Sequence, residues 1–128
     1  PKRDWSSDVC SSDLLSPPLG ALPGVTIHHG TANAILLPAV LRFNESCCGA
    51  KYARLRAALG LPASADLAAW VRNFTARLGL PVALHAVGVP REELPRLAED
   101  AALDFSSRTN PRPATAADYL QLYLESYE

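Results

Sequence analysis

The alternation of apolar and polar positions divides the chain into a short polar start and a long helical region. From Leu15 to the end, Ala and Leu recur at helical spacing, and Gly and Pro separate the segments. The pattern predicts helices over 31–44, 49–60, 64–79, 90–103 and 115–127. Pro38 is expected to kink the first of these helices or to divide it. We therefore expect an all-α fold, a bundle of about five helices joined by short loops.

The same pattern predicts the ends and the buried faces of the helices. Ser64 is expected to cap the helix over 64–79, and Thr115 with Asp118 resembles a capping box in which Asp replaces Glu. Apolar faces are predicted at Tyr52, Leu55 and Leu59; at Leu67, Val71, Phe74 and Leu78; at Leu94, Leu97 and Ala101; and at Tyr119, Leu122 and Tyr123. The core is expected to include four aromatic side chains, those of Trp70, Phe74, Tyr119 and Tyr123.

Composition narrows the class of protein. The 128 residues suffice for one domain of ordinary size, and 48% of them are apolar, 20% are charged, and the net charge is −1. This balance is typical of a globular cytoplasmic protein and argues against a nucleic-acid partner, which would favour a basic surplus. The sequence contains no run of about eighteen apolar residues, so we expect no membrane span.

The cysteines favour neither a disulfide framework nor a thiolate zinc site. Cys10 stands apart, Cys47 and Cys48 are adjacent, and no CxxC spacing occurs. We expect reduced thiols in a cytoplasmic protein, and any bound metal would need His or carboxylate ligands.

Three ordered segments resemble one enzyme family. The block HHGTANAILLPAVLRFN resembles the metal-binding segment of the iron-containing (group III) alcohol dehydrogenases. AKYARLRAALGL resembles the helix that follows it, and AEDAALDFSSRTNPRPATAADYLQLYLESY resembles the C-terminal signature of the family. The likeness runs from about Leu15 to the end. It implies that residues 15–128 are a fragment of the C-terminal helical domain, of the dehydroquinate synthase-like type.

The resemblance also implies the chemistry of a longer parent protein. Members of the family use NAD(P) and a divalent metal, iron or sometimes zinc, to interconvert alcohols and aldehydes or hydroxy acids and keto acids. An Asp and three His hold the metal, and the last of these ligands corresponds to His29, before Gly30. The preceding ligand corresponds to position 13, where this chain has Asp13, and Pro17 stands where many members have another His. No catalytic or NAD(P)-binding residue is assigned in this chain.

The residues themselves are consistent with that role for His29. A helix start disfavours the imidazolium form, which leaves a neutral nitrogen free to coordinate, and the adjacent Gly30 lets backbone pass close. The alternative is a helix-capping or loop histidine. His28 is expected at the surface or beside the metal ligands, and His85 in the core or a loop. Arg112, between two prolines, is expected to pair with a carboxylate or to hold the C-terminal helix in place.

The start of the chain differs in character from the rest. Residues 4–14, DWSSDVCSSDL, resemble the translation of one frame of a widely used sequencing-library adapter. We therefore expect residues 1–14 to be a non-native, disordered leader; the alternative is a natural serine-rich tail.

A single histidine does not hold a catalytic divalent ion, because such sites need three or four protein ligands. We therefore expect this chain alone to lack dehydrogenase activity and to bind metal weakly, and to self-associate through apolar surface that other helices would cover. Two alternatives remain, a free-standing helical interaction module and a pseudo-enzyme without a metal site.

Overall fold

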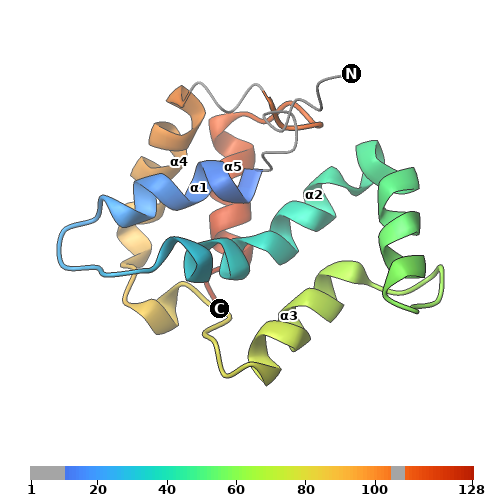
Figure 1. Cartoon of the computed structure of the whole chain (residues 1–128). Helices are drawn as coiled ribbons and strands as arrows, with labels where there is room; N and C mark the ends of the chain where they lie inside the picture. Colours follow the sequence, from blue (N-terminus) through green and yellow to red (C-terminus); the bar gives the residue numbers. More distant parts are fainter. Residues whose placement is uncertain (1–10, 105–108) are drawn as a thin grey trace, which may run out of the picture.

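A computed structural model describes the backbone of residues 11–104 and 109–128, and the side chains from Leu15 onward within those ranges. The described elements are α1 (Ser11–Gly20), α2 (His29–Ala58), α3 (Leu67–Arg77), α4 (Leu94–Leu103) and α5 (Ala116–Glu125), with short 3₁₀ turns at His85–Val87 and Arg91–Glu93. Within these ranges no strand occurs. The predicted all-α fold with about five helices is confirmed (Figure 1). None of these helices is long and apolar enough to cross a bilayer.

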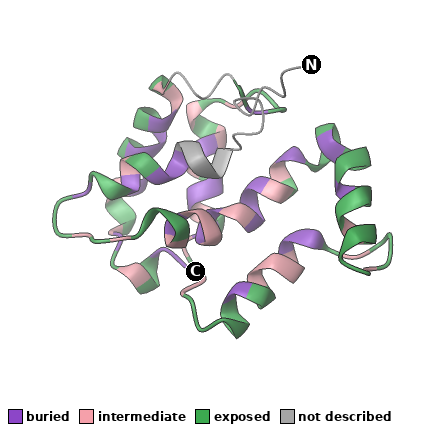
Figure 2. Ribbon diagram, in the orientation of Figure 1, coloured by how far each residue is buried: buried purple, intermediate pink, exposed green. Residues whose placement is uncertain are grey.

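The bundle consists of α1, the first half of α2, α4 and α5, which pack around one apolar core (Figures 1 and 2). The predicted faces of α4 and α5 are confirmed, because the following residues are all buried: Leu94, Leu97, Ala101, Tyr119, Leu122 and Tyr123. The first half of α2 adds Ile35, Leu36 and Val40. The C-terminus is held at this core, since the amide of Leu84 donates to the carbonyl of Ser126 at 2.9 Å.

Helix α1 was not predicted, and its first four residues, 11–14, belong to the stretch assigned to the leader, whose non-native origin stays a prediction. Its leucines explain the helix: Leu15 and Leu19 are one turn apart and fully buried in the core. Tertiary burial therefore outweighs the weak helix propensity of a segment that contains Pro17 and Pro18. The rest of the predicted leader, residues 1–10, lies outside the described residues.

Helix α2 joins two segments that were predicted as separate helices, and its break lies elsewhere than expected. Pro38 is buried inside the helix, whereas the non-helical backbone occurs at Cys48, with φ −121° and ψ 18°. Gly49 follows directly, and glycine destabilises a helix interior by about 1 kcal/mol relative to alanine. The helix is therefore not divided at Pro38, and the non-helical backbone lies ten residues later, at Cys48.

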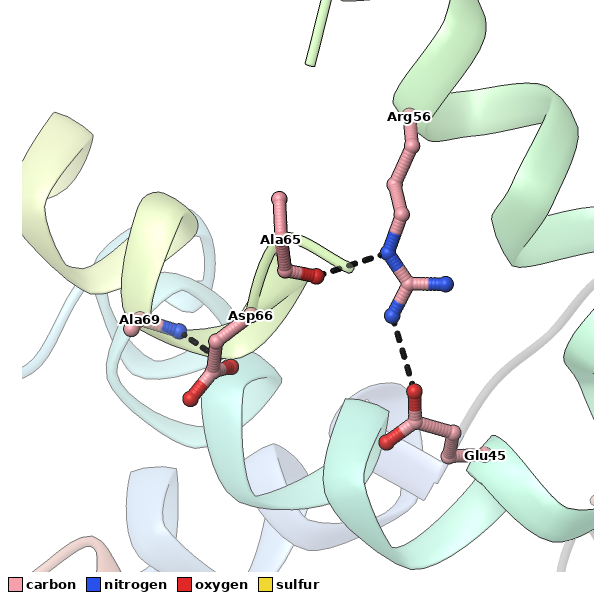
Figure 3. A network of polar contacts seen from close by, with 5 residues as sticks. All are labelled: Glu45, Arg56, Ala65, Asp66 and Ala69. Carbon is pink, nitrogen blue, oxygen red and sulfur yellow. Dashed lines mark hydrogen bonds and ion pairs between the residues drawn. The ribbon is translucent and has the colours of Figure 1, made fainter. Parts of the chain in front are cut away.

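The arm, residues 49–80, contains the second half of α2, which extends away from the bundle, and helix α3, which runs back beneath α2 (Figure 1). A small apolar cluster of Cys48, Tyr52 and Leu67 lies at its base. Polar contacts supplement this cluster (Figure 3): Arg56 donates through Nε to the carbonyl of Ala65 at 2.7 Å and forms an ion pair with Glu45 at 2.8 Å. Arg72 of α3 adds hydrogen bonds to the carbonyls of Val82 at 3.1 Å and Glu128 at 2.7 Å, so the arm depends on polar contacts as well as on its small cluster.

Two expectations for the arm are wrong. The N-cap of α3 is Asp66 instead of Ser64, because the Asp66 carboxylate accepts from the amide of Ala69 at 3.0 Å (Figure 3). Much of the predicted apolar stripe is exposed: the exposed fraction is 42% for Phe74 and 59% for Leu78, while Thr75 is buried. The other exposed large apolar side chains of the arm are Leu55, Leu59 and Leu80. Of the four aromatic side chains expected in the core, Phe74 is exposed, Trp70 is partly exposed, and Tyr119 and Tyr123 are buried.

The segment before α5 is fixed to α2 by polar contacts. Asn44 and Asn110 exchange two amide hydrogen bonds of 2.9 Å in the interior. Arg112 donates to the carbonyl of Phe43 at 3.0 Å and lies over its ring, 4.0 Å from the centroid. The expected role of Arg112 in holding the C-terminal helix is therefore confirmed. The predicted capping box of α5 is also present at Thr115.

Candidate metal-ligand site

His29 is the first residue of α2, and its exposed side chain lies beside α1. The preceding residue, His28, has the extended backbone of an N-cap, and its carbonyl accepts the amide of Ala32 at 3.0 Å. The imidazole of His29 therefore stands in the first helical turn, next to the unpaired amides of the helix start. The expected position at a helix start is confirmed.

Both ring nitrogens of His29 have protein neighbours. The Oγ of Ser16, in α1, lies 3.0 Å from Nδ1. The side-chain Nδ2 of Asn33, one turn along α2, lies 3.2 Å from Nε2. An amide nitrogen donates and does not accept, so Nε2 carries the lone pair in this contact and Nδ1 carries the hydrogen that points to Ser16. This neutral form presents Nε2 as the nitrogen that can coordinate a metal.

Contacts of α1 with the bundle determine where Ser16 lies. Its neighbour Leu15 is fully buried, and the hydroxyl of Tyr123 donates to the Leu15 carbonyl at 2.7 Å. Burial raises the pKa of Tyr123, so its hydroxyl stays protonated and remains a donor. Ser16 itself is only 3% exposed. A core tyrosine in α5 thus supports the residue that touches His29.

The described residues fit one ligand of a metal site. His29 offers a neutral nitrogen at an exposed position, as coordination requires. Within the described ranges, however, no three His, Cys, Asp or Glu side chains come together around a point. Position 13 lies in α1, but the side chain of Asp13 is outside the description, and Pro17 is exposed on the same helix. The remaining ligands would have to come from outside the described residues.

The other two histidines, Cys47 and Cys48 each have surroundings of their own, separate from the contacts of His29. His28 is exposed, and its side chain does not cap α2. His85 is exposed on a 3₁₀ turn, where its Nδ1 lies 2.6 Å from the carbonyl of Tyr127. Cys47 is exposed, Cys48 is buried, and both are free thiols in the middle of α2. The expectation of a loop position for His85 is confirmed.

Gly30 leaves open space next to His29. A Cβ atom placed on it would meet no atom of the described residues within 4 Å. The close backbone approach expected there does not occur among the described residues.

Sequence reasoning missed the two side chains that touch the His29 ring. Asn33 follows His29 by four residues inside the block TANAILLP, so helical spacing was a usable signal for it. Ser16 gave no such signal, because it reaches His29 across thirteen residues and a loop, from a helix that was not predicted.

Comparison with known proteins agrees with the fold and gives the family. Residues 15–127 match the Fe-containing alcohol dehydrogenase family, C-terminal. The chain is 44% identical over 119 residues to 4-hydroxybutyrate dehydrogenase of Cupriavidus necator, covering 88% of this chain and 31% of that protein. It is 36% identical over 117 residues to lactaldehyde reductase of Escherichia coli (strain K12), covering 85% of this chain and 30% of that protein.

A solved structure shares the architecture. The structure of a 1,3-propanediol oxidoreductase superimposes with a TM-score of 0.84 at 26% identity, covering 93% of this chain and 33% of the other. The chain thus spans about a third of the length of these proteins. The family match over residues 15–127 shows that the chain belongs to the Fe-containing alcohol dehydrogenase family and corresponds to part of its C-terminal helical region.

Proposed function

We propose that this chain is the metal-binding helical part of an NAD(P)-dependent dehydrogenase acting on small alcohols and aldehydes, hydroxy acids included, and that His29 is one metal ligand. The observation that carries the proposal is the environment of the His29 ring at an exposed helix start: Ser16 contacts Nδ1, and Nε2 contacts the Asn33 amide through an exposed hydrogen bond. When bound, a divalent iron or zinc ion supplies Lewis-acid polarisation of the substrate oxygen, and the nicotinamide exchanges hydride.

The residues of this chain have binding and orienting roles in that scheme. His29 supplies a ring nitrogen that can donate a lone pair to the metal. Ser16 holds the far side of the ring, and the buried core behind α1 keeps Ser16 in place. The upstream ligands, the nucleotide-binding region and half of the substrate pocket belong to the longer protein.

The names of the relatives support the substrate class. They are a hydroxybutyrate dehydrogenase, a lactaldehyde reductase and a propanediol oxidoreductase, all named for small oxygenated compounds. The free thiols of Cys47 and Cys48 support a reducing, cytoplasmic location. The exposed leucines of the arm support self-association of the isolated chain, which size-exclusion chromatography at increasing concentration would detect.

For the chain alone we expect no dehydrogenase turnover. Since the described residues provide one imidazole at the site, adding iron or zinc to the chain with NADH or NADPH and a panel of aldehydes should leave the absorbance of the cofactor unchanged. Turnover above background, in a preparation free of host dehydrogenases, would contradict this expectation.

A chimera tests the function itself. Residues 15–128 replace the matching segment of the Cupriavidus necator enzyme, which supplies the preceding residues and the rest of its own chain. We expect the chimera to oxidise 4-hydroxybutyrate with a nicotinamide cofactor, and His29→Ala to lower kcat/KM by at least about 100-fold.

The neighbouring histidine is the matched control. His28→Ala should retain the activity of the chimera, because the His28 side chain makes no capping contact and lies in the same exposed turn. Equal activity of the two alanine variants would refute the ligand role of His29. A folded but inactive parent chimera would favour a pseudo-enzyme, in which Pro17 has replaced a needed histidine.

A further inference from the structure

We infer that Ser16 is a positioning residue, which fixes His29 in the Nδ1–H tautomer and so makes Nε2 the coordinating atom, and that Asn33 occupies Nε2 until a metal displaces it. The inference rests on the proposed function for its metal, but its structural content concerns three side chains of this chain. Sequence signals for the ligand identify His29 and do not identify the coordinating nitrogen or the residue that selects it.

The hydrogen-bonding capacities of the three side chains select one tautomer. A neutral imidazole has one donor nitrogen and one acceptor nitrogen. The Asn33 amide nitrogen, 3.2 Å from Nε2, requires an acceptor there. Nδ1 is then the donor, and the Ser16 hydroxyl, 3.0 Å away, accepts from it. The opposite tautomer would place two N–H donors face to face at Nε2.

The burial of Ser16 determines which contact is fixed and which can be exchanged. Ser16 is 3% exposed, and its helix is anchored by the Tyr123 bond to the Leu15 carbonyl. The contact between Asn33 and His29 is exposed and lies within one helix turn. A ligand approaching from solvent can therefore replace the Asn33 amide, whereas the Ser16 contact stays behind the ring and orients it. Outer contacts of this kind change metal affinity by about 10- to 100-fold.

His85 provides an internal reference for the same measurement. Its Nδ1 lies 2.6 Å from the carbonyl of Tyr127, and a carbonyl accepts only. His85 is therefore also expected as the Nδ1–H tautomer, for a reason that involves neither Ser16 nor a metal. His28, exposed and outside this network, serves as the solvated reference.

The first experiment reads the tautomer in the unmodified chain, and alanine variants serve only to assign its signals. Two-dimensional NMR that correlates ring nitrogens with ring carbon-bound protons, on the ¹⁵N-labelled chain at about pH 8, distinguishes protonated from unprotonated nitrogens of the neutral imidazole. Each of the variants His28→Ala, His29→Ala and His85→Ala lacks the signals of one histidine, and the missing signals assign that residue. We expect His29 to have a protonated Nδ1 and an unprotonated Nε2. A protonated Nε2 in the unmodified chain would overturn the inference.

Ser16→Ala tests the cause. Because it removes the acceptor at Nδ1, we expect the Nδ1–H population of His29 to fall while the His85 pattern stays unchanged. Ser16→Thr, which retains a hydroxyl, should restore the tautomer. An unchanged His29 tautomer in a folded Ser16→Ala chain would show that Ser16 does not select it.

The chimera separates this inference from the proposed function. There we expect Ser16→Ala to weaken Zn²⁺ binding about tenfold in a competition with a chromophoric chelator, and Asn33→Ala to leave it equal or tighter. Unchanged Zn²⁺ affinity in Ser16→Ala, alongside loss in His29→Ala, overturns the positioning role and leaves the ligand role intact. Unchanged affinity in His29→Ala refutes the proposed function, whatever the tautomer.

Discussion

The bundle and the arm share one long helix, α2, yet different interactions stabilise the two regions. In the first half of α2, apolar side chains enter a core that α1, α4 and α5 also line. Beyond Cys48, the same helix contributes to a small apolar cluster at the base of the arm. The exposed leucines of the arm are Leu55, Leu59, Leu78 and Leu80. Figure 2 shows the contrast as buried positions concentrated in the bundle and exposed ones along the outer arm.

This difference explains where the candidate site lies. His29 is at the bundle end of α2, and its neighbour Ser16 is supported by fully buried residues. Metal ligands need to be held within about 0.5 Å of a productive position, and a packed core can do this. The arm has polar contacts and a small cluster instead, so we expect it to open locally before the bundle unfolds.

The largest expected effect is a cavity in the bundle. Leu97→Ala removes a fully buried side chain from the common core, and we expect it to lower the free energy of unfolding by about 3 kcal/mol. Urea denaturation followed by circular dichroism measures the loss. A loss below about 1 kcal/mol would show that the bundle core is no better packed than the arm.

The corresponding substitution in the arm should have a local effect. Leu67→Ala removes a side chain that is 4% exposed, and we expect amides of residues 49–80 to exchange faster, with an opening free energy about 2 kcal/mol lower. Exchange in α4 and α5 should be unchanged. Leu78→Ala is the control, because Leu78 is 59% exposed, and it should alter stability by no more than about 0.5 kcal/mol. Faster exchange throughout the bundle would mean that the two regions unfold together.

The polar contacts of the arm can be separated by a pair of variants. Arg56→Gln removes the hydrogen bond to the Ala65 carbonyl and the ion pair with Glu45, and we expect a loss of about 1 kcal/mol. Glu45→Gln removes the ion pair alone; the Glu45 side chain is 55% exposed, so the loss should stay below about 0.5 kcal/mol. Equal losses in the two variants, by urea denaturation, would assign the stabilisation to the ion pair.

The smallest effect is a pH dependence in the bundle. The pKa of Asp118 lies below its ordinary value of 3.8, because the backbone amide and the hydroxyl of Thr115 donate to the carboxylate and Arg112 lies nearby. A lowered pKa stabilises the fold above 3.8, and this contribution disappears as pH falls through the lower, folded-state pKa.

Asp118→Asn removes that titration. Because the carboxylate is largely solvated, the free energy of unfolding of the wild type should exceed that of the variant by less than about 1 kcal/mol at pH 6. This difference in free energy should shrink as pH falls below 3.8. Thermal unfolding at several pH values measures it. A difference that stays constant down to the lowest pH would contradict the lowered pKa.

Local signals in the sequence predicted the elements whose structure is locally determined. The Thr115–Asp118 capping box needs only neighbouring residues, and the faces of α4 and α5 are correct because the helices around them are present. In the arm, the helical spacing of apolar residues identified positions such as Phe74 and Leu78. Spacing alone does not show whether another helix covers these side chains.

The candidate site was only half predictable for a related reason. His29 followed from a motif resemblance and from its place before a helix, and Asn33 lay within reach of a spacing argument. The role of Ser16 can be recognised only in the folded structure, because it depends on the packing of α1. Burial of Leu15 and Leu19 stabilises that helix despite its two prolines. Long-range burial decided that element, and local propensity did not indicate it.

The most direct test of the central claim, that His29 is a metal ligand held at the rigid end of the bundle, is the metal content of the purified chimera. Inductively coupled plasma mass spectrometry on the parent chimera, His28→Ala and His29→Ala would give metal per chain. We predict close to one divalent metal per chain in the first two and a large loss in His29→Ala, with all three equally folded by circular dichroism. Full metal content in His29→Ala would contradict the account.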